Sequence, residues 1–71
     1  MSTRILLEKF EDIDYALVFL TTNNLTPFVC TWAPVYREDG TIDRWGQGHY
    51  FSSLINAIAY INDKREEMNG N

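Results

Sequence analysis

Residues 28–61 read FVCTWAPVYREDGTIDRWGQGHYFSSLINAIAYI and contain a hairpin signal, most of the aromatic residues and an amphipathic helical pattern. The pair Asp39-Gly40 favours a hairpin with a type I′ turn, which needs positive φ at both central residues. With this pair at the tip, residues whose numbers add up to 79 face each other. The register therefore predicts four opposing pairs: Phe28 with Phe51, Cys30 with His49, Trp32 with Gln47, and Pro34 with Trp45.

The two strands of this hairpin span residues 28–36 and about 45–51. Because residues two apart share a face, one face is expected to carry Phe28, Cys30, Trp32, Trp45, His49 and Phe51. Pro34 has no amide hydrogen and indicates an edge position or a bulge. Gly46 and Gly48 also allow a bulge.

A helix is expected after an N-cap at Ser52 or Ser53 and should run to about Glu67. Its core-facing stripe is predicted at helical spacing, and the residues of that stripe are Leu54, Ala57, Ile58, Ile61 and Met68. Residues 69–71 (NGN) end the helix and are expected to form a disordered tail.

Two further strands are expected before this stretch. Residues 4–10 (RILLEKF) are short and rich in branched side chains, with a helical turn as the alternative. Residues 15–21 (YALVFLT) alternate with apolar side chains on both faces. Residues 22–27 form a loop that ends in Pro27.

The predicted fold class is α+β, a four-stranded antiparallel meander in the order ββββα with the C-terminal helix on one face of the sheet. Residues 1–71 make a single domain. Because one helix hides only one face, the second face is expected to expose an apolar patch, a common mark of a partner surface.

Composition limits the function classes. The 71 residues carry a formal net charge of −4, which argues against simple binding of phosphate backbones. A domain of this size has little room for an enclosed active site, so we do not expect an enzyme. The single cysteine excludes an intrachain disulfide. Without a signal peptide or an apolar run of membrane-spanning length, the chain is expected to be cytoplasmic, with no membrane partner.

Cys30 and His49 are the only residues that suggest metal or thiol chemistry. Zinc needs about four such ligands, and a cysteine nucleophile needs further groups to orient and activate it. We therefore predict no catalytic residue, no cofactor and no metal site, and interpret the pair as a packed thiol beside a surface histidine.

Two groups of residues are candidates for contact with a partner. Aromatic side chains on a small sheet can anchor a protein or fill the core, and carboxylates can form an acidic patch or a solvated turn. The candidate partner surface consists of Trp32, Tyr36, Trp45, His49, Tyr50, Glu38, Asp39 and Asp43. The candidate acidic patch consists of Glu8, Glu11, Asp12 and Asp14.

The order of strand, Asp-Gly turn and strand, followed by Phe51-Ser52-Ser53-Leu54 and then Ala57-Ile58 at the start of a helix, resembles the arm-binding domain of phage and transposon integrases. That resemblance implies a three-stranded sheet with one helix and DNA binding through the sheet. This sequence departs from the pattern because its strands lack the basic residues.

A second set of residues, Pro27-Phe28-Val29, Thr31-Trp32, Trp45-Gly46 and Gly48-His49-Tyr50-Phe51, is similar to small uncharacterised proteins of conjugative transposons and related mobile elements. It implies a genomic context and no defined activity.

The leading hypothesis is a small non-enzymatic protein-binding module of a mobile element or phage. A specific form is an acidic inhibitor of a host defence complex. One alternative is a nucleic-acid-binding domain of the integrase-arm type, led by Arg37, Arg44, Trp32 and Trp45. Another is a homodimer that forms through an edge or face of the sheet.

Overall fold

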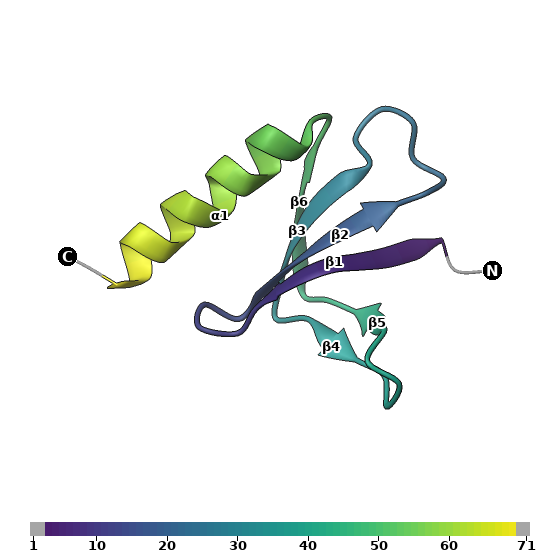
Figure 1. Ribbon diagram of the computed structural model, residues 1–71, viewed down its shortest axis with the longest axis horizontal. Coiled ribbons are helices and arrows are strands. Elements are labelled where there is room, and N and C mark those ends of the chain that lie inside the picture. The colour runs from purple at the N-terminus through teal and green to yellow at the C-terminus, as the bar shows by residue number, and fades with distance from the viewer. Residues whose placement is uncertain (1–2, 70–71) are drawn as a thin grey trace.

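The computed structural model describes residues 3–69 and contains one helix and two antiparallel sheets (Figure 1). The larger sheet has four strands in the order β1-β2-β3-β6, and the smaller sheet pairs β4 with β5. The elements are β1 (Arg4–Phe10), β2 (Tyr15–Leu20), β3 (Phe28–Trp32), β4 (Val35–Tyr36), β5 (Ile42–Arg44), β6 (Gln47–Phe51) and α1 (Leu54–Asn69). The predicted α+β class, with a four-stranded antiparallel sheet and a C-terminal helix packed on it, is confirmed.

The side chains of β2 alternate between the two faces of the sheet, so buried apolar residues lie on both faces. On the face covered by α1, the buried residues are Phe10, Ile13, Tyr15, Leu17, Cys30, Ala57 and Ile61. On the opposite face they are Ala16, Val18, Val29 and Ile42, with Leu6, Leu20, Tyr36 and Trp45 packed against them. We call these the helix face and the hairpin face. The β4–β5 hairpin covers the hairpin face, on the other side of the sheet from α1 (Figure 1).

The predicted register is confirmed where the long strands pair. Phe28 faces Phe51, Cys30 faces His49 and Trp32 faces Gln47. Beyond Trp32 the chain turns away, because Ala33 has a left-handed φ of 55°. The predicted single strand over residues 28–36 is therefore divided between β3 and β4.

This bend changes which residues lie near the hairpin tip. The predicted pairing of Pro34 with Trp45 is wrong, because neither residue lies in a strand. Val35 with Arg44 keeps the predicted register, which shifts by one residue before Tyr36 pairs with Ile42. Trp45 was expected on the face of Cys30, but it packs on the hairpin face. The prediction that the face opposite the helix exposes an apolar patch is also wrong, since Ile42 of the β4–β5 hairpin is buried against this hairpin face.

The hairpin tip has the predicted location but a different turn. The Gly40 amide donates to the Arg37 carbonyl at 3.0 Å, so Glu38 and Asp39 are the central residues. Of the two residues Asp39 and Gly40, only Gly40 has a positive φ, at 91°. A type I′ turn with this pair at its centre would require positive φ at both residues.

The helix begins as predicted, since the Ser53 hydroxyl accepts a hydrogen bond from the Asn56 amide at 3.1 Å. It extends to Asn69, two residues beyond the expected end at about Glu67 and into the first residue of the expected tail, while residues 70–71 lie outside the described residues. The predicted core stripe holds only for Ala57 and Ile61. Leu54, Ile58 and Met68 are exposed, because α1 packs on β3 and β6 and leaves its other sides in solvent.

Candidate functional site

Two chain connections meet at one end of the four-stranded sheet, the end where β1 turns into β2. The Ala33 amide, which follows β3, donates a 3.0 Å hydrogen bond to the carbonyl of Asp14, in the β1–β2 turn. Both residues have left-handed backbone, with φ of 55° for Ala33 and 59° for Asp14. This hydrogen bond places Trp32 and the start of β4 beside the β1–β2 turn.

Two of the predicted aromatic residues lie at this end. Trp32 faces the buried Tyr15 across the ladder, yet 46% of its own surface is exposed. Tyr36 is half-buried on the hairpin face, and the Lys9 ammonium lies 4.4 Å from its ring centre. Burial, and then the negative charges of Glu11 and Asp14, raise the pKa of Tyr36. Both carboxylates are therefore close enough to Tyr36 to act on its charge.

The predicted acidic patch is divided in the structure. Asp12 forms an ion pair with Arg65 of α1, with 3.3 Å between Oδ2 and Nε. Glu8, Glu11 and Asp14 are exposed and form no ion pair within residues 3–69. Glu8 faces Leu17 in the ladder and so lies on β1, away from the turn. We define the turn-end surface as Glu11, Asp14, Trp32 and Tyr36.

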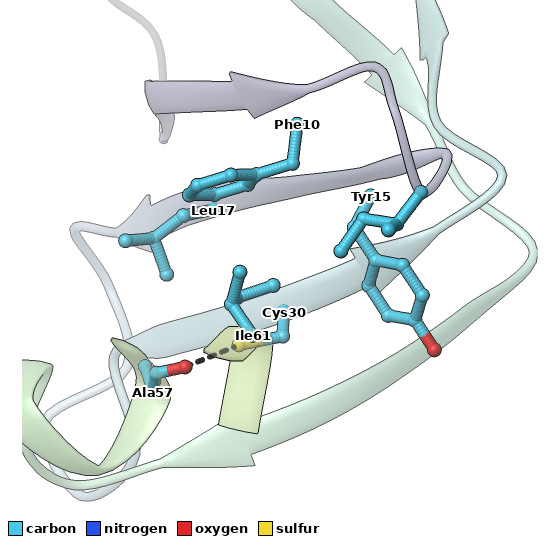
Figure 2. Packing of buried hydrophobic residues seen from close by; sticks show 7 residues of the cluster. Phe10, Tyr15, Leu17, Cys30, Ala57 and Ile61 are labelled. Carbon is cyan, nitrogen blue, oxygen red and sulfur yellow. Dashed lines mark hydrogen bonds between the residues drawn. The ribbon is translucent and has the colours of Figure 1, made fainter. Parts of the chain in front are cut away.

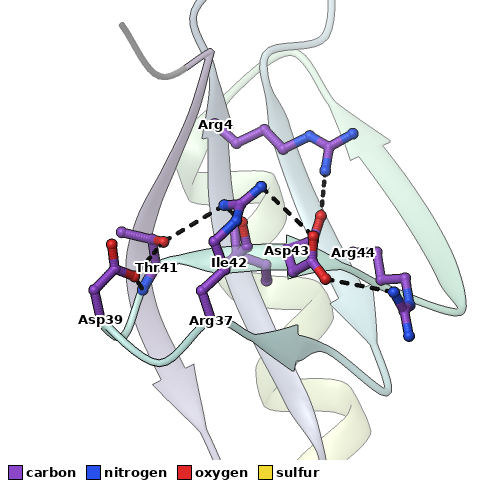
Figure 3. Close-up of polar contacts among 7 residues, drawn as sticks. All are labelled: Arg4, Arg37, Asp39, Thr41, Ile42, Asp43 and Arg44. Carbon is purple, nitrogen blue, oxygen red and sulfur yellow. Dashed lines mark hydrogen bonds and ion pairs between the residues drawn. The ribbon is translucent and has the colours of Figure 1, made fainter.

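The acidic residues of the hairpin tip mainly hold the hairpin together (Figure 3). Asp43 lies 3.5 Å from Arg37 and 3.4 Å from Arg44, and its carbonyl accepts a hydrogen bond from Arg4. Asp39 accepts hydrogen bonds from the hydroxyl and the amide of Thr41 at 2.6 and 3.0 Å, and these lower its carboxyl pKa. Of the three predicted tip carboxylates, Glu38 and Asp39 are exposed and form no ion pair among the described residues, whereas Asp43 pairs with Arg37 and Arg44.

The other predicted partner residues lie on different faces. Trp45 is half-buried on the hairpin face, with the Arg4 guanidinium 5.0 Å from its ring centre. Tyr50 pairs with Val29 and is 48% exposed on β6. His49 lies on the helix face, 4.7 Å from the ring centre of Tyr60. The structure therefore does not bring the eight predicted residues into one surface.

The Cys30 thiol is part of the core between β3 and α1 (Figure 2). It is fully buried, and its Sγ donates to the Ala57 carbonyl at 3.3 Å. Burial raises the pKa of the thiol to about 11, so it stays neutral at neutral pH. The interpretation as a packed thiol is confirmed. Within residues 3–69, no three His, Cys, Asp or Glu side chains are grouped in a way that could hold a metal ion.

Sequence reasoning missed an apolar row on the helix face. Ile5, Phe19 and Phe28 face one another across β1, β2 and β3, with 5.4 Å between the two phenylalanine ring centres. Ile5 is exposed and the phenylalanines are half-buried, while Leu54 and Ile58 of α1 are exposed as well. The alternation of β2 gave the signal for Phe19, but the incomplete cover by α1 is visible only in the fold.

Comparisons with protein-family models, curated proteins and solved structures find no match for this chain. No helix in the described part of the chain is long and apolar enough to cross a membrane.

Proposed function

We propose that this chain is a non-enzymatic protein-binding module whose turn-end surface receives a basic segment of a protein partner. The observations that carry the proposal are the Glu11 and Asp14 carboxylates near Tyr36, which form no ion pair within residues 3–69, and the 46% exposed Trp32, whose neighbour Ala33 donates a backbone hydrogen bond to Asp14. Cations are attracted to aromatic faces and to carboxylates, and tryptophan is a frequent anchor of protein interfaces. A lysine or arginine side chain complements this arrangement.

In its specific form, the proposal assigns the chain to a mobile element or phage and makes it an inhibitor of a host defence complex in the cytoplasm. Such complexes bind nucleic acid through basic surfaces, which an acidic protein can occupy. The small size and the net charge of −4 support this form, because a negatively charged protein repels the anionic ligands that compete for the same basic surface.

The nucleic-acid alternative has less support. Arg37 and Arg44, its two leading basic residues, both form ion pairs with Asp43. Trp45 is half-buried beside Arg4 and so offers little ring surface for stacking on a base.

An NMR titration with a short arginine-rich peptide tests the proposal. We expect chemical-shift changes at residues 11–14 and 32–36, and at least a tenfold weaker affinity in a Trp32→Ala variant. Asp14→Asn removes a charge but tolerates left-handed backbone, so it tests the electrostatic contribution without straining the turn. Leu25→Ala is the matched control, since Leu25 is 83% exposed in the β2–β3 loop.

Two results would contradict the proposal. One is an affinity that Trp32→Ala leaves unchanged. The other is tight, salt-sensitive binding of duplex DNA in a mobility-shift assay, which would favour the nucleic-acid alternative.

A further inference from the structure

The two edges of the four-stranded sheet differ in how they are protected. Natural edge strands are guarded by charged residues, bulges or covering segments. β1 has a register shift between Leu6 and Glu8, carries three charged residues, and lies against β5. β6 has the sequence QGHYF, carries no formally charged residue, and pairs with β3 over five consecutive residues without a shift. β6 is therefore the unguarded edge.

The hydrogen bonds of the neighbouring strands show which backbone groups of β6 face outward. Leu20 donates to the Pro27 carbonyl at 2.7 Å, and Ala33 donates to Asp14, so the odd-numbered residues of β3 face β2. Because successive residues alternate between the two edges of a strand, Cys30 faces β6. Its partner in the ladder is His49, which therefore faces β3.

The residues on either side of His49 consequently point the other way. Gly48 and Tyr50 direct their N–H and C=O groups to the open edge, where no strand within residues 3–69 pairs with them. These groups are solvated in the single chain and are ready to form a ladder with another strand.

We infer that β6 pairs with β6 of a second copy of this chain, antiparallel and with a two-fold axis at His49. In this register Gly48 of each copy lies opposite Tyr50 of the other, and the two residues exchange both backbone hydrogen bonds. The pairing joins the two sheets into one, with both α1 helices on the same side.

A second copy fits this edge better than an unrelated strand does, because the edge is self-complementary. Elsewhere two copies repel each other through a net charge of −4 each, but residues 45–62 contain no Asp, Glu, Lys or Arg. Tyr50 is 48% exposed, so much of its ring remains available for contact with a second copy.

The dimer goes beyond the proposed binding function and does not depend on it, since the turn-end surface has no residue on β6. The contact is small, as expected for a reversible association, so we expect a Kd between about 1 μM and 1 mM.

Analytical ultracentrifugation over a concentration series tests the inference. The expected mass rises from 8.3 kDa toward twice that value. Hydrogen exchange by NMR gives the register: protection of the Gly48 and Tyr50 amides should increase at least tenfold with concentration. The amide of Lys9, which faces outward on β1, should stay unprotected. Both measurements use the unmodified chain, so they do not depend on how a variant folds.

Matched variants then separate the two edges. Tyr50→Lys places a charge on β6 and should weaken the dimer at least tenfold. Leu7→Lys makes a similar change on β1, where Leu7 is 46% exposed, and should leave the dimer intact. A chain that stays monomeric at about 1 mM, or a dimer that is lost only with Leu7→Lys, would overturn the inference.

Discussion

The amide of Ala33 donates a hydrogen bond to the carbonyl of Asp14, and both residues have left-handed backbone. Asparagine and aspartate tolerate this conformation, but for alanine it costs roughly 1–2 kcal/mol. The bend is retained because it turns the chain from β3 toward β4 and lets the hairpin reach the opposite face of the sheet. Two turns remote in sequence therefore depend on one backbone contact.

Ala33→Gly is expected to stabilise the protein by about 0.5–1 kcal/mol. The substitution removes the left-handed strain, and the larger conformational freedom of glycine in the unfolded chain offsets part of the gain. Urea unfolding followed by circular dichroism measures the change. Ala59→Gly is the control, because Ala59 lies exposed in α1, where the same substitution should destabilise by about 1 kcal/mol. If Ala33→Gly also lowered the free energy of unfolding, as the control does, the claim that Ala33 is strained would be contradicted.

Ile42→Ala is expected to destabilise the fold by about 2–5 kcal/mol, the usual cost of such a truncation in a core. Ile42 is 1% exposed and packs against Ala16, Val18 and Val29, so it fixes the hairpin to the sheet. Thermal unfolding measures the loss. Val35→Ala on the paired strand is the control, because Val35 is exposed and its truncation should change stability by no more than about 0.5 kcal/mol. Equal effects would mean that the hairpin does not rest on the sheet.

The register of the long hairpin could be predicted because strand pairing depends on counting from the tip. Phe28 and Cys30 therefore had correct partners even though the turn type was wrong. Pro34 indicated an irregularity here, but the left-handed bend at Ala33 had no local signal, since alanine is not a residue that favours this backbone. Its cause is the distant carbonyl of Asp14.

The candidate site was predictable only in part for a similar reason. Sequence reasoning treated Asp43 and Arg44 as exposed charges, but the fold joins them in an ion pair. Ile42 stands among polar residues, so its burial under the fold had no local signal in the sequence. Trp32 is 46% exposed, but the backbone contact of its neighbour Ala33 with Asp14 depends on the bend and could not be predicted.

Gly48→Ala is expected to destabilise the fold by about 1–3 kcal/mol through overpacking. A Cβ at this position would lie 2.9 Å from Trp45 Nε1 and 3.0 Å from Val29 Cγ2, so the indole or the strand must move. Urea unfolding measures the loss, and the indole resonance of Trp45 should shift. Gly46→Ala is the milder comparison, because its nearest neighbour is the exposed Trp32 ring at 3.2 Å. A larger effect at Gly46 would contradict the packing of Trp45 on Gly48.

The buried thiol of Cys30 should make stability fall at alkaline pH. Its pKa is raised from 9.0 to about 11 in the fold, so the neutral thiol is the form that folding favours. This contribution is fully present below the unfolded pKa and is lost as the pH rises through the folded one. At about 1.36 kcal/mol per unit, the loss is roughly 2 kcal/mol between pH 9 and pH 11 and is complete only about one pH unit higher. Urea unfolding at a series of pH values measures it. A Cys30→Ala variant is less stable at pH 7 but should show a shallower alkaline decline, because the buried thiol no longer contributes to it. An equally steep decline in the variant would assign the pH dependence to Tyr36 and Tyr60, whose pKa values are also raised by burial.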